Sequence, residues 1–199
     1  MASASPFDSV TYSRRNLYAM MMFWGACSDY VAARCCLLNY LFSGLPLAAH
    51  AVEKMLKAFI FLSSGAKTTL KSRNGDLHNP YLLKQELRRT YADSKLDSFD
   101  DLLKKLFQHY QSRYHDNPNQ AKSRSSAELQ KIDELFVYLL ATVPMPNEVK
   151  YNTYFFQALC NPRLAIVLAD RRWALENNAP MQAQLPAFET AWQRFGKRA

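Results

Sequence analysis

Residues 47–62, with the sequence LAAHAVEKMLKAFIFL, decide the fold of this chain. Apolar residues recur there at steps of three and four, which places them on one side of a helix. Glu53 precedes Lys57 by four residues, the favoured order for an ion pair on a helix surface. The stretch therefore predicts an amphipathic helix over residues 47–64, ended by Gly65. Its apolar stripe consists of Val52, Met55, Leu56, Phe59 and Leu62.

The polar side of this helix carries His50, Lys54 and Lys57, for which we consider two interpretations. In the first, these cationic or polar side chains face a groove and bind phosphate as point charges. In the second, they form a solvated face that the Glu53–Lys57 pair stabilises. We favour the second, because charged runs on helices usually face water.

The rest of the chain also predicts helices. An apolar stripe at helical spacing runs through residues 13–43, and Gly25 interrupts it only as a possible bend. Ser98 is expected to cap a helix whose first turn contains Asp100 and Asp101, which suit the positive end of the helix dipole. The expected helices are residues 13–43, 47–64, 79–92, 99–114 and 126–142, followed by short helices from residue 148. The stripe of the first helix is expected to consist of Leu17, Met20, Met21, Trp24, Val31, Cys35, Leu38 and Phe42.

These elements predict an all-α protein, an up-and-down helical bundle with additional C-terminal helices. Residues 1–12 are expected to be a flexible N-terminus, 13–143 the bundle, and 144–199 a C-terminal helical extension packed on it. A short Gly-Pro turn predicts that the first two helices pack antiparallel at the centre.

The amino-acid composition limits which functions and which cellular locations can be expected for this chain. The 199 residues include 25 basic and 17 acidic side chains, a net charge of +8 that favours an anionic partner. The four cysteines form no Cys-x-x-Cys pair and are expected to be buried thiols in a reducing cytoplasm. The first residues do not resemble a signal peptide, and no window is apolar enough to span a membrane. We therefore expect a soluble, cytoplasmic protein that does not bind membranes.

Basic residues are concentrated between residues 66 and 95. Seven basic and three acidic side chains give this segment a charge of +4, half the net charge of the chain. An anion would be expected to dock at such a segment. The basic residues are Lys67, Lys71, Arg73, Lys84, Arg88, Arg89 and Lys95.

Four pieces of sequence, in this order, resemble the HEPN domain family (higher eukaryotes and prokaryotes nucleotide-binding). Residues 29–34 (DYVAAR) and 48–58 (AAHAVEKMLKA) are similar to its first two core helices, with the typical Glu-Lys-x-Leu-Lys-Ala segment. Residues 76–83 (DLHNPYLL) take the place of the start of its third helix. Residues 113–116 (RYHD) are similar to an Arg-Tyr-Pro-Asp turn, with His in place of Pro. The resemblance covers roughly residues 15–143.

The resemblance implies a helical bundle, a homodimer, and binding of nucleotide or RNA. Many bacterial members pair with a nucleotidyltransferase partner in toxin–antitoxin systems. The nucleotide- or RNA-binding residues expected from the resemblance and from charge are His50, Lys54, Lys57, Lys67, Lys71, Asn74 and Arg113.

Family members that cleave RNA carry Arg, four to six residues, then His, and Arg73 with His78 meets a spacing of this kind. Arg73 would clamp the phosphate and His78 would act as general base on a ribose hydroxyl, without a metal. In the alternative interpretation, His78 caps or packs at the start of the third helix and Arg73 is a solvated loop charge. The pair precedes the third helix, whereas the family motif lies near a later one, so we expect a non-catalytic member.

No cofactor or metal is expected. His109, His115 and Asp116 cross a predicted helix end and match no standard metal-binding spacing. The leading hypothesis is thus a HEPN-like protein that binds nucleotide or RNA. The alternatives are a metal-independent endoribonuclease that uses Arg73 and His78, and a helical protein–protein interaction module.

Overall fold

The computed structural model describes residues 14–41, 43–63, 78–112, 126–161 and 168–196, and this part of the chain is all-helical, without strands, as predicted. Within these ranges, no helix combines the length and apolarity needed to cross a bilayer. The helices are α1 (Arg14–Leu38), α2 (Gly44–Ser63), α3 (Pro80–Arg88), the 3₁₀ helix η2 (Ser94–Phe99), α4 (Asp100–Ser112), α5 (Ser126–Thr142), α6 (Asn147–Lys150), α7 (Tyr154–Cys160), α8 (Leu168–Leu175) and α9 (Ala179–Phe195).

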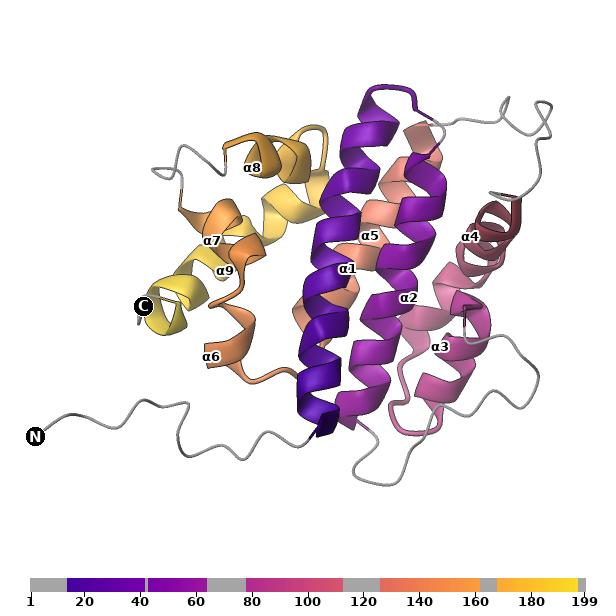
Figure 1. The fold of residues 1–199 in the computed structure, drawn as a ribbon, viewed down its shortest axis with the longest axis horizontal. Coiled ribbons are helices and arrows are strands. Elements are labelled where there is room, and N and C mark those ends of the chain that lie inside the picture. The colour runs from indigo at the N-terminus through magenta and orange to yellow at the C-terminus, as the bar shows by residue number, and fades with distance from the viewer. Residues whose placement is uncertain (1–13, 42, 64–77, 113–125, 162–167, 197–199) are drawn as a thin grey trace, which may run out of the picture.

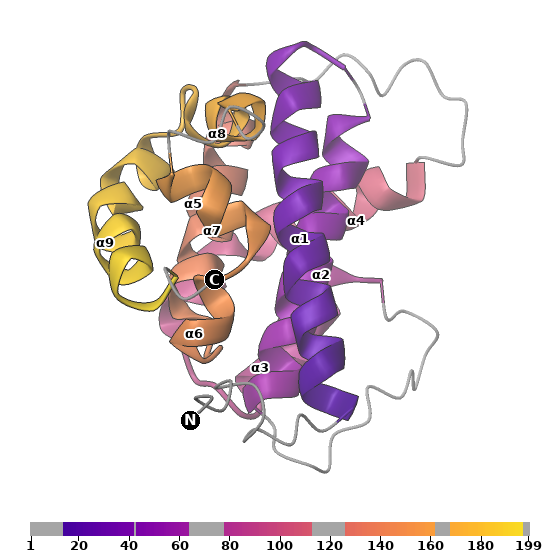
Figure 2. The ribbon, with the colours of Figure 1, turned by 60° about the vertical axis from the view of Figure 1, so that its left-hand side comes forward.

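The helices α1 and α2 form an antiparallel pair at the centre of the molecule (Figure 1). The helices α3 and α4 lie on one side of this pair, and α6 to α9 lie on the other, with α5 behind it (Figures 1 and 2). This arrangement confirms the predicted central pair. It also gives α2 one face toward α1 and another toward α3 and α4.

The turn between α1 and α2 ends the first helix at Leu38, five residues earlier than predicted. The N–H of Leu41 donates to the carbonyl of Cys36 at 2.8 Å, and the N–H of Tyr40 donates to that of Leu37 at 3.1 Å. These two bonds form a Schellman motif, in which the residue after the cap adopts a left-handed conformation. Tyr40 takes that position with φ of 60°.

The helix α2 begins at Gly44, three residues before the predicted start. Pro46 fits the first turn because the N–H groups there have no intrahelical partner. Gly44 allows α1 and α2 to approach closely: a Cβ at this position would lie 2.5 Å from Cγ of Leu37 and 2.9 Å from the carbonyl oxygen of Ala33.

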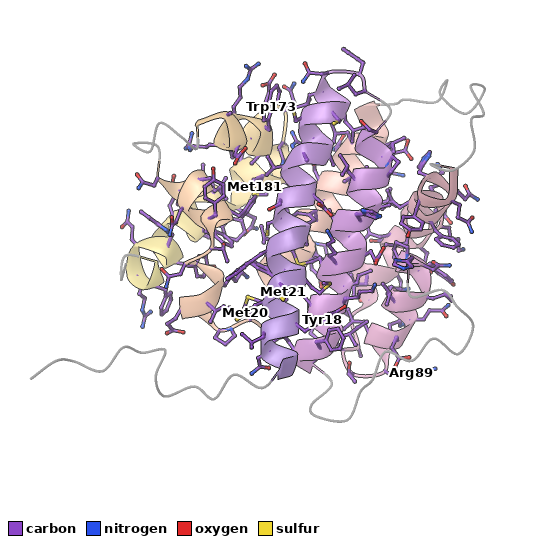
Figure 3. All side chains as sticks on the ribbon, in the orientation of Figure 1. Tyr18, Met20, Met21, Arg89, Trp173 and Met181 are labelled. Carbon is purple, nitrogen blue, oxygen red and sulfur yellow. The ribbon has the colours of Figure 1, made fainter. Side chains whose placement is uncertain are left out.

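The buried side of α1 differs from the predicted stripe. Its core positions include Ala19, Phe23, Ala26, Tyr30 and Ala33, all nearly without solvent contact. The predicted stripe residues Leu17, Met21 and Trp24 are instead 48%, 62% and 47% exposed, and Figure 3 shows Met21 on the outward side of α1. The prediction was wrong because α1 is apolar on most of its circumference. Periodicity alone does not choose the inward face of such a helix, and small residues let α2 pack closely.

A buried polar network joins α1 to α5 and to the C-terminal helices. Arg34 is fully buried and forms an ion pair with Asp133 of α5. Its Nε also donates to the carbonyl of Trp173 at 2.7 Å. The hydroxyl of Tyr30 donates to Asp133 at 2.8 Å and accepts from Nδ2 of Asn178 at 2.8 Å. The network therefore fixes the C-terminal helices on the central pair.

The observed starts of α3 and α4 agree only in part with the starts expected from the sequence. Asn79, the first residue of the expected helix 79–92, caps α3, because its side-chain oxygen accepts from the N–H of Tyr81 at 3.0 Å. Ser98 is not the cap of α4: its hydroxyl donates to the carbonyl of Lys95, and Asp93 caps the 3₁₀ helix η2 instead.

The predicted helix over residues 79–92 is also too long, because α3 ends at Arg88. The N–H groups of Thr90 and Tyr91 both donate to the carbonyl of Leu87. This tightened last turn stops the helix before the segment capped by Asp93.

Candidate functional site

Three side chains of α2 share the side that faces α3 and α4. His50, Glu53 and Lys57 are spaced by three and four residues, which places them on one face of the helix. The N-terminal end of α3 brings His78 to this face, and α4 brings Tyr110. We call these five residues the His–Tyr cluster.

Glu53 is the centre of the hydrogen bonding in the cluster. Nζ of Lys57 donates to Oε1 of Glu53 at 2.6 Å, and Nδ1 of His78 lies 3.0 Å from the same oxygen. Glu53 and Lys57 are both buried. The favoured prediction of a solvated polar face was therefore wrong. The helices α3 and α4 cover this side of α2, and the buried charges are tolerated because they pair with each other.

Tyr110 joins the two histidines through ring contacts. Its ring centroid lies 5.5 Å from that of His78 with the planes 11° apart, a stacked arrangement. The centroid of His50 lies 5.2 Å away at 51°. Tyr110 is not among the residues selected from the sequence, because nothing local distinguishes it from other aromatic residues in amphipathic helices.

The orientation of His78 defines what the cluster can do chemically. Nδ1 faces the carboxylate of Glu53, and the side chain is about half exposed. Among the described residues, no hydrogen bond to Nε2 is seen, so Nε2 is the nitrogen with which the cluster would meet a ligand. When neutral, an imidazole held in this way carries its proton on Nδ1 and accepts at Nε2. When protonated, it donates from Nε2 as well. The cluster thus combines a hydrogen-bonding imidazole with stacked aromatic rings.

Lys54 lies outside the cluster, contrary to the prediction that grouped it with His50 and Lys57. Its Nζ donates to Asp29 of α1 at 2.7 Å. Its aliphatic part passes over Gly25, where an added Cβ would lie 3.3 Å from Cδ of Lys54. Lys54 therefore bridges α1 and α2, and Gly25 makes room for it within a continuous helix.

Several predicted site residues lie outside the described residues. Because Arg73 is one of them, the structure gives no distance between Arg73 and His78. The others are Lys67, Lys71, Asn74 and Arg113, together with His115 and Asp116 from the candidate metal set.

In the described part of the basic segment, Lys84, Arg88 and Arg89 form ion pairs with acidic side chains. Lys84 is buried and contacts Asp97 and Asp100, the latter at 2.6 Å. Arg88 also contacts Asp97, at 3.1 Å. The formal charge counted along the sequence therefore overstated the positive charge that residues 78–95 present to an anion. Acidic residues of the following helices neutralise part of this charge.

His109 has a role within the bundle. Its Nε2 lies 3.3 Å from Glu128 of α5, a contact that joins α4 to α5. Among the residues that the structure describes, no three His, Cys, Asp or Glu side chains gather as metal ligands.

Comparisons of this chain with protein-family models, with curated proteins and with solved structures found no match. The HEPN resemblance therefore stays a prediction that depends on the sequence motifs.

Proposed function

We propose that this chain is a HEPN-like helical protein that binds nucleotide or RNA at the His–Tyr cluster. The observation that carries the proposal is the convergence of His50, Lys57 and His78, three residues selected from the sequence, around Tyr110 and Glu53. These residues come from α2, from the turn before α3 and from α4. Their meeting supports a shared task.

The chemistry of the cluster suits a nucleobase next to a phosphate. Because His78 stacks on Tyr110 and remains half exposed, a base would extend that stack on the open side of the imidazole. Base stacking on aromatic side chains contributes roughly 1–3 kcal/mol per base. Nε2 of His78 would meet a phosphate or a base edge, and the basic residues 67, 71 and 73 follow α2 in sequence.

The test is a titration of the purified protein with a fluorescein-labelled ten-nucleotide single-stranded RNA at several salt concentrations. Tyr110→Leu retains apolar volume but removes the ring, and it should weaken binding roughly 5- to 100-fold. His78→Ala should weaken binding as well. Lys131→Ala is the matched control, since Lys131 is an exposed cation on α5 and its removal should lower affinity only slightly.

Equal affinities for wild type, Tyr110→Leu and Lys131→Ala would show that RNA binds a nonspecific basic surface. Absence of RNA and nucleotide binding would contradict the proposal and favour the helical protein–protein interaction module.

A second candidate is the metal-independent endoribonuclease that uses Arg73 and His78. The observation that favours it is the contact between His78 and Glu53, because a buried carboxylate on Nδ1 orients an imidazole to accept a proton at Nε2. Incubation with RNA in the presence of a chelator tests it. Cleavage that disappears in both Arg73→Ala and His78→Ala would establish catalysis, and equal cleavage by wild type and both variants would indicate a contaminant.

The proposal also includes a homodimer and, following the resemblance, a nucleotidyltransferase partner within a toxin–antitoxin system. Co-expression with a nucleotidyltransferase encoded beside this chain, followed by co-purification, tests the partner. Failure to co-purify would leave the ligand-binding proposal standing and contradict the pairing.

A further inference from the structure

A cavity of about 660 Å³ lies between α1 and the C-terminal helices. The helix α1 supplies one wall, and α7, the turn before it and α8 supply the other. Figures 1 and 2 show α7 and α8 beside α1, on the side of the central pair away from α3 and α4. The cavity is therefore separate from the His–Tyr cluster. Its size is within the range of small-molecule sites, roughly 300–1,000 Å³.

Small side chains create the hollow, and aromatic side chains line it. The small residues are Ser28, Ala32, Ala158 and Ala174, and the aromatic ones are Trp24, Tyr154, Phe155 and Trp173. Trp24 and Tyr154 are 47% and 53% exposed. Large rings beside a hollow leave apolar surface that a flat ligand would cover.

Two residues of opposite charge, Asp170 and Arg171 of α8, also line the cavity. Nε of Arg171 donates to the carbonyl of Leu159 in α7 at 3.0 Å, which fixes the base of the guanidinium group. Among the described residues, no hydrogen bond to its two Nη nitrogens is seen, and neither Asp170 nor Arg171 forms an ion pair. A guanidinium group held in this way presents two parallel donors, the geometry that matches a carboxylate.

The remaining polar groups of the cavity suit a ligand that donates hydrogen bonds. Asp170 lies near the hydroxyl of Tyr154 and near Cys35 of α1. A carboxylate accepts several hydrogen bonds at once, so Asp170 can also accept from a ligand. Asn152 lines the cavity too, and its buried Oδ1 has no hydrogen-bond partner within the described part of the chain. An ammonium group meets these acceptors, and aromatic faces attract it as well.

We propose that the cavity binds a small zwitterion with an aromatic ring, of the chemical class of the aromatic amino acids. Arg171 holds the carboxylate of the ligand, and Asp170 accepts from its ammonium group. The ring lies among the aromatic side chains of the cavity wall. A purely anionic or purely cationic ligand would leave one of the two charged residues without a counter-charge, next to a group of its own sign. This site does not depend on the proposed RNA site.

The test is isothermal titration calorimetry of the full chain at pH 7 with three probes that share an indole ring. L-Tryptophan carries both charges, indole-3-propionate lacks the ammonium group, and tryptamine lacks the carboxylate. We expect L-tryptophan to bind and the other two to bind roughly 10- to 100-fold more weakly, because each loses one charge-assisted contact. Absence of L-tryptophan binding at millimolar concentration, or equal affinities for the three probes, would overturn the proposal.

Substitutions of the two charged residues assign the contacts. Arg171→Gln should weaken binding of L-tryptophan and of indole-3-propionate by a similar factor, and it should leave tryptamine binding nearly unchanged. Asp170→Asn should instead weaken binding of L-tryptophan and tryptamine and spare indole-3-propionate. The matched control is Arg89→Gln, since Arg89 is 72% exposed on α3, and it should change none of the three affinities.

A third substitution tests the place of binding. Ser28→Phe fills the cavity from an exposed position on α1 and should abolish binding of all three probes. Urea denaturation of each variant separates lost binding from lost folding, and the comparison of probes on wild type needs no variant. An L-tryptophan affinity unchanged by Ser28→Phe, Arg171→Gln and Asp170→Asn would place binding elsewhere and overturn the proposal. RNA affinity of the same variants is measured separately, so failure of one proposal is distinguishable from failure of the other.

Discussion

Replacement of Lys150 by Met should stabilise this protein at neutral pH. Lys150 is only 4% exposed, and its Nζ donates to the carbonyl of Ala141 at 3.2 Å. Among the described residues no carboxylate forms an ion pair with it. Burial lowers the pKa of Lys150 from 10.5 to about 8. The folded protein therefore holds a poorly solvated ammonium group at pH 7.

The size and sign of the effect follow from the two pKa values. A difference between 10.5 and about 8 corresponds to about 3 kcal/mol of free energy of unfolding, at 1.36 kcal/mol for each pH unit. Below pH 8 both states are protonated and the penalty is complete. Between pH 8 and 10.5 the unfolded chain retains a proton that the folded chain releases, so stability rises with pH. Methionine removes the penalty but loses a hydrogen bond, worth about 1 kcal/mol, so the net gain at pH 7 is about 1–2 kcal/mol.

Urea denaturation of wild type and Lys150→Met at pH 7, 8, 9 and 10 measures this effect. The stability advantage of the variant should shrink as pH rises, because only wild type gains from deprotonation of this lysine. Lys131→Met, on the exposed side of α5, should show no such trend. A Lys150→Met variant that is less stable than wild type at pH 7, or a difference between the two that does not change with pH, would show that burial of the Lys150 ammonium does not destabilise the fold.

Three further predictions concern the fold and are measured by urea denaturation. Arg34→Met should cost about 3–5 kcal/mol, because it leaves Asp133 buried without its cation, whereas Arg34→Met combined with Asp133→Leu should recover much of that loss. Tyr40→Gly should stabilise by about 1 kcal/mol, since glycine adopts φ of 60° without strain, and Tyr40→Ala should not. Gly44→Ala should destabilise, because its Cβ would lie 2.9 Å from a backbone carbonyl oxygen that does not move aside easily; a neutral result would show that the α1–α2 contact is loose.

Helix content was predictable from the sequence because its signals are local. The amphipathic pattern of α2, the Asn79-Pro80 start of α3 and the acidic first turn of α4 each depend on residues within a few positions. Helix ends were less predictable. The Schellman turn at Tyr40 uses a residue type that rarely adopts a left-handed conformation, so no sequence signal marked it.

The side of each helix that points into the core could not be predicted from local sequence patterns, because it depends on contacts with helices elsewhere in the chain. The outer side of α1 is as apolar as its inner side, so hydrophobicity did not separate them. On α2, the polar side with Glu53 and Lys57 is buried because α3 and α4, from later in the chain, pack over it. The structure places His50, Lys57 and His78 close together, but Tyr110 and the contacts of Glu53 could be found only from the three-dimensional arrangement.

Two clusters of polar and charged residues flank the central helix pair, and their burial indicates different roles. Arg34 and Asp133 are both buried, and their hydrogen bonds end on protein groups, so nothing remains for a ligand. In the His–Tyr cluster, the Glu53–Lys57 pair is also buried, but it supports a histidine whose side chain is about half exposed. In a preorganised site, buried and fully hydrogen-bonded residues hold an exposed side chain in one orientation. The buried Glu53–Lys57 pair and the half-exposed imidazole of His78 have this arrangement. The first cluster therefore contributes to stability, and the second is the place where we propose that a ligand binds.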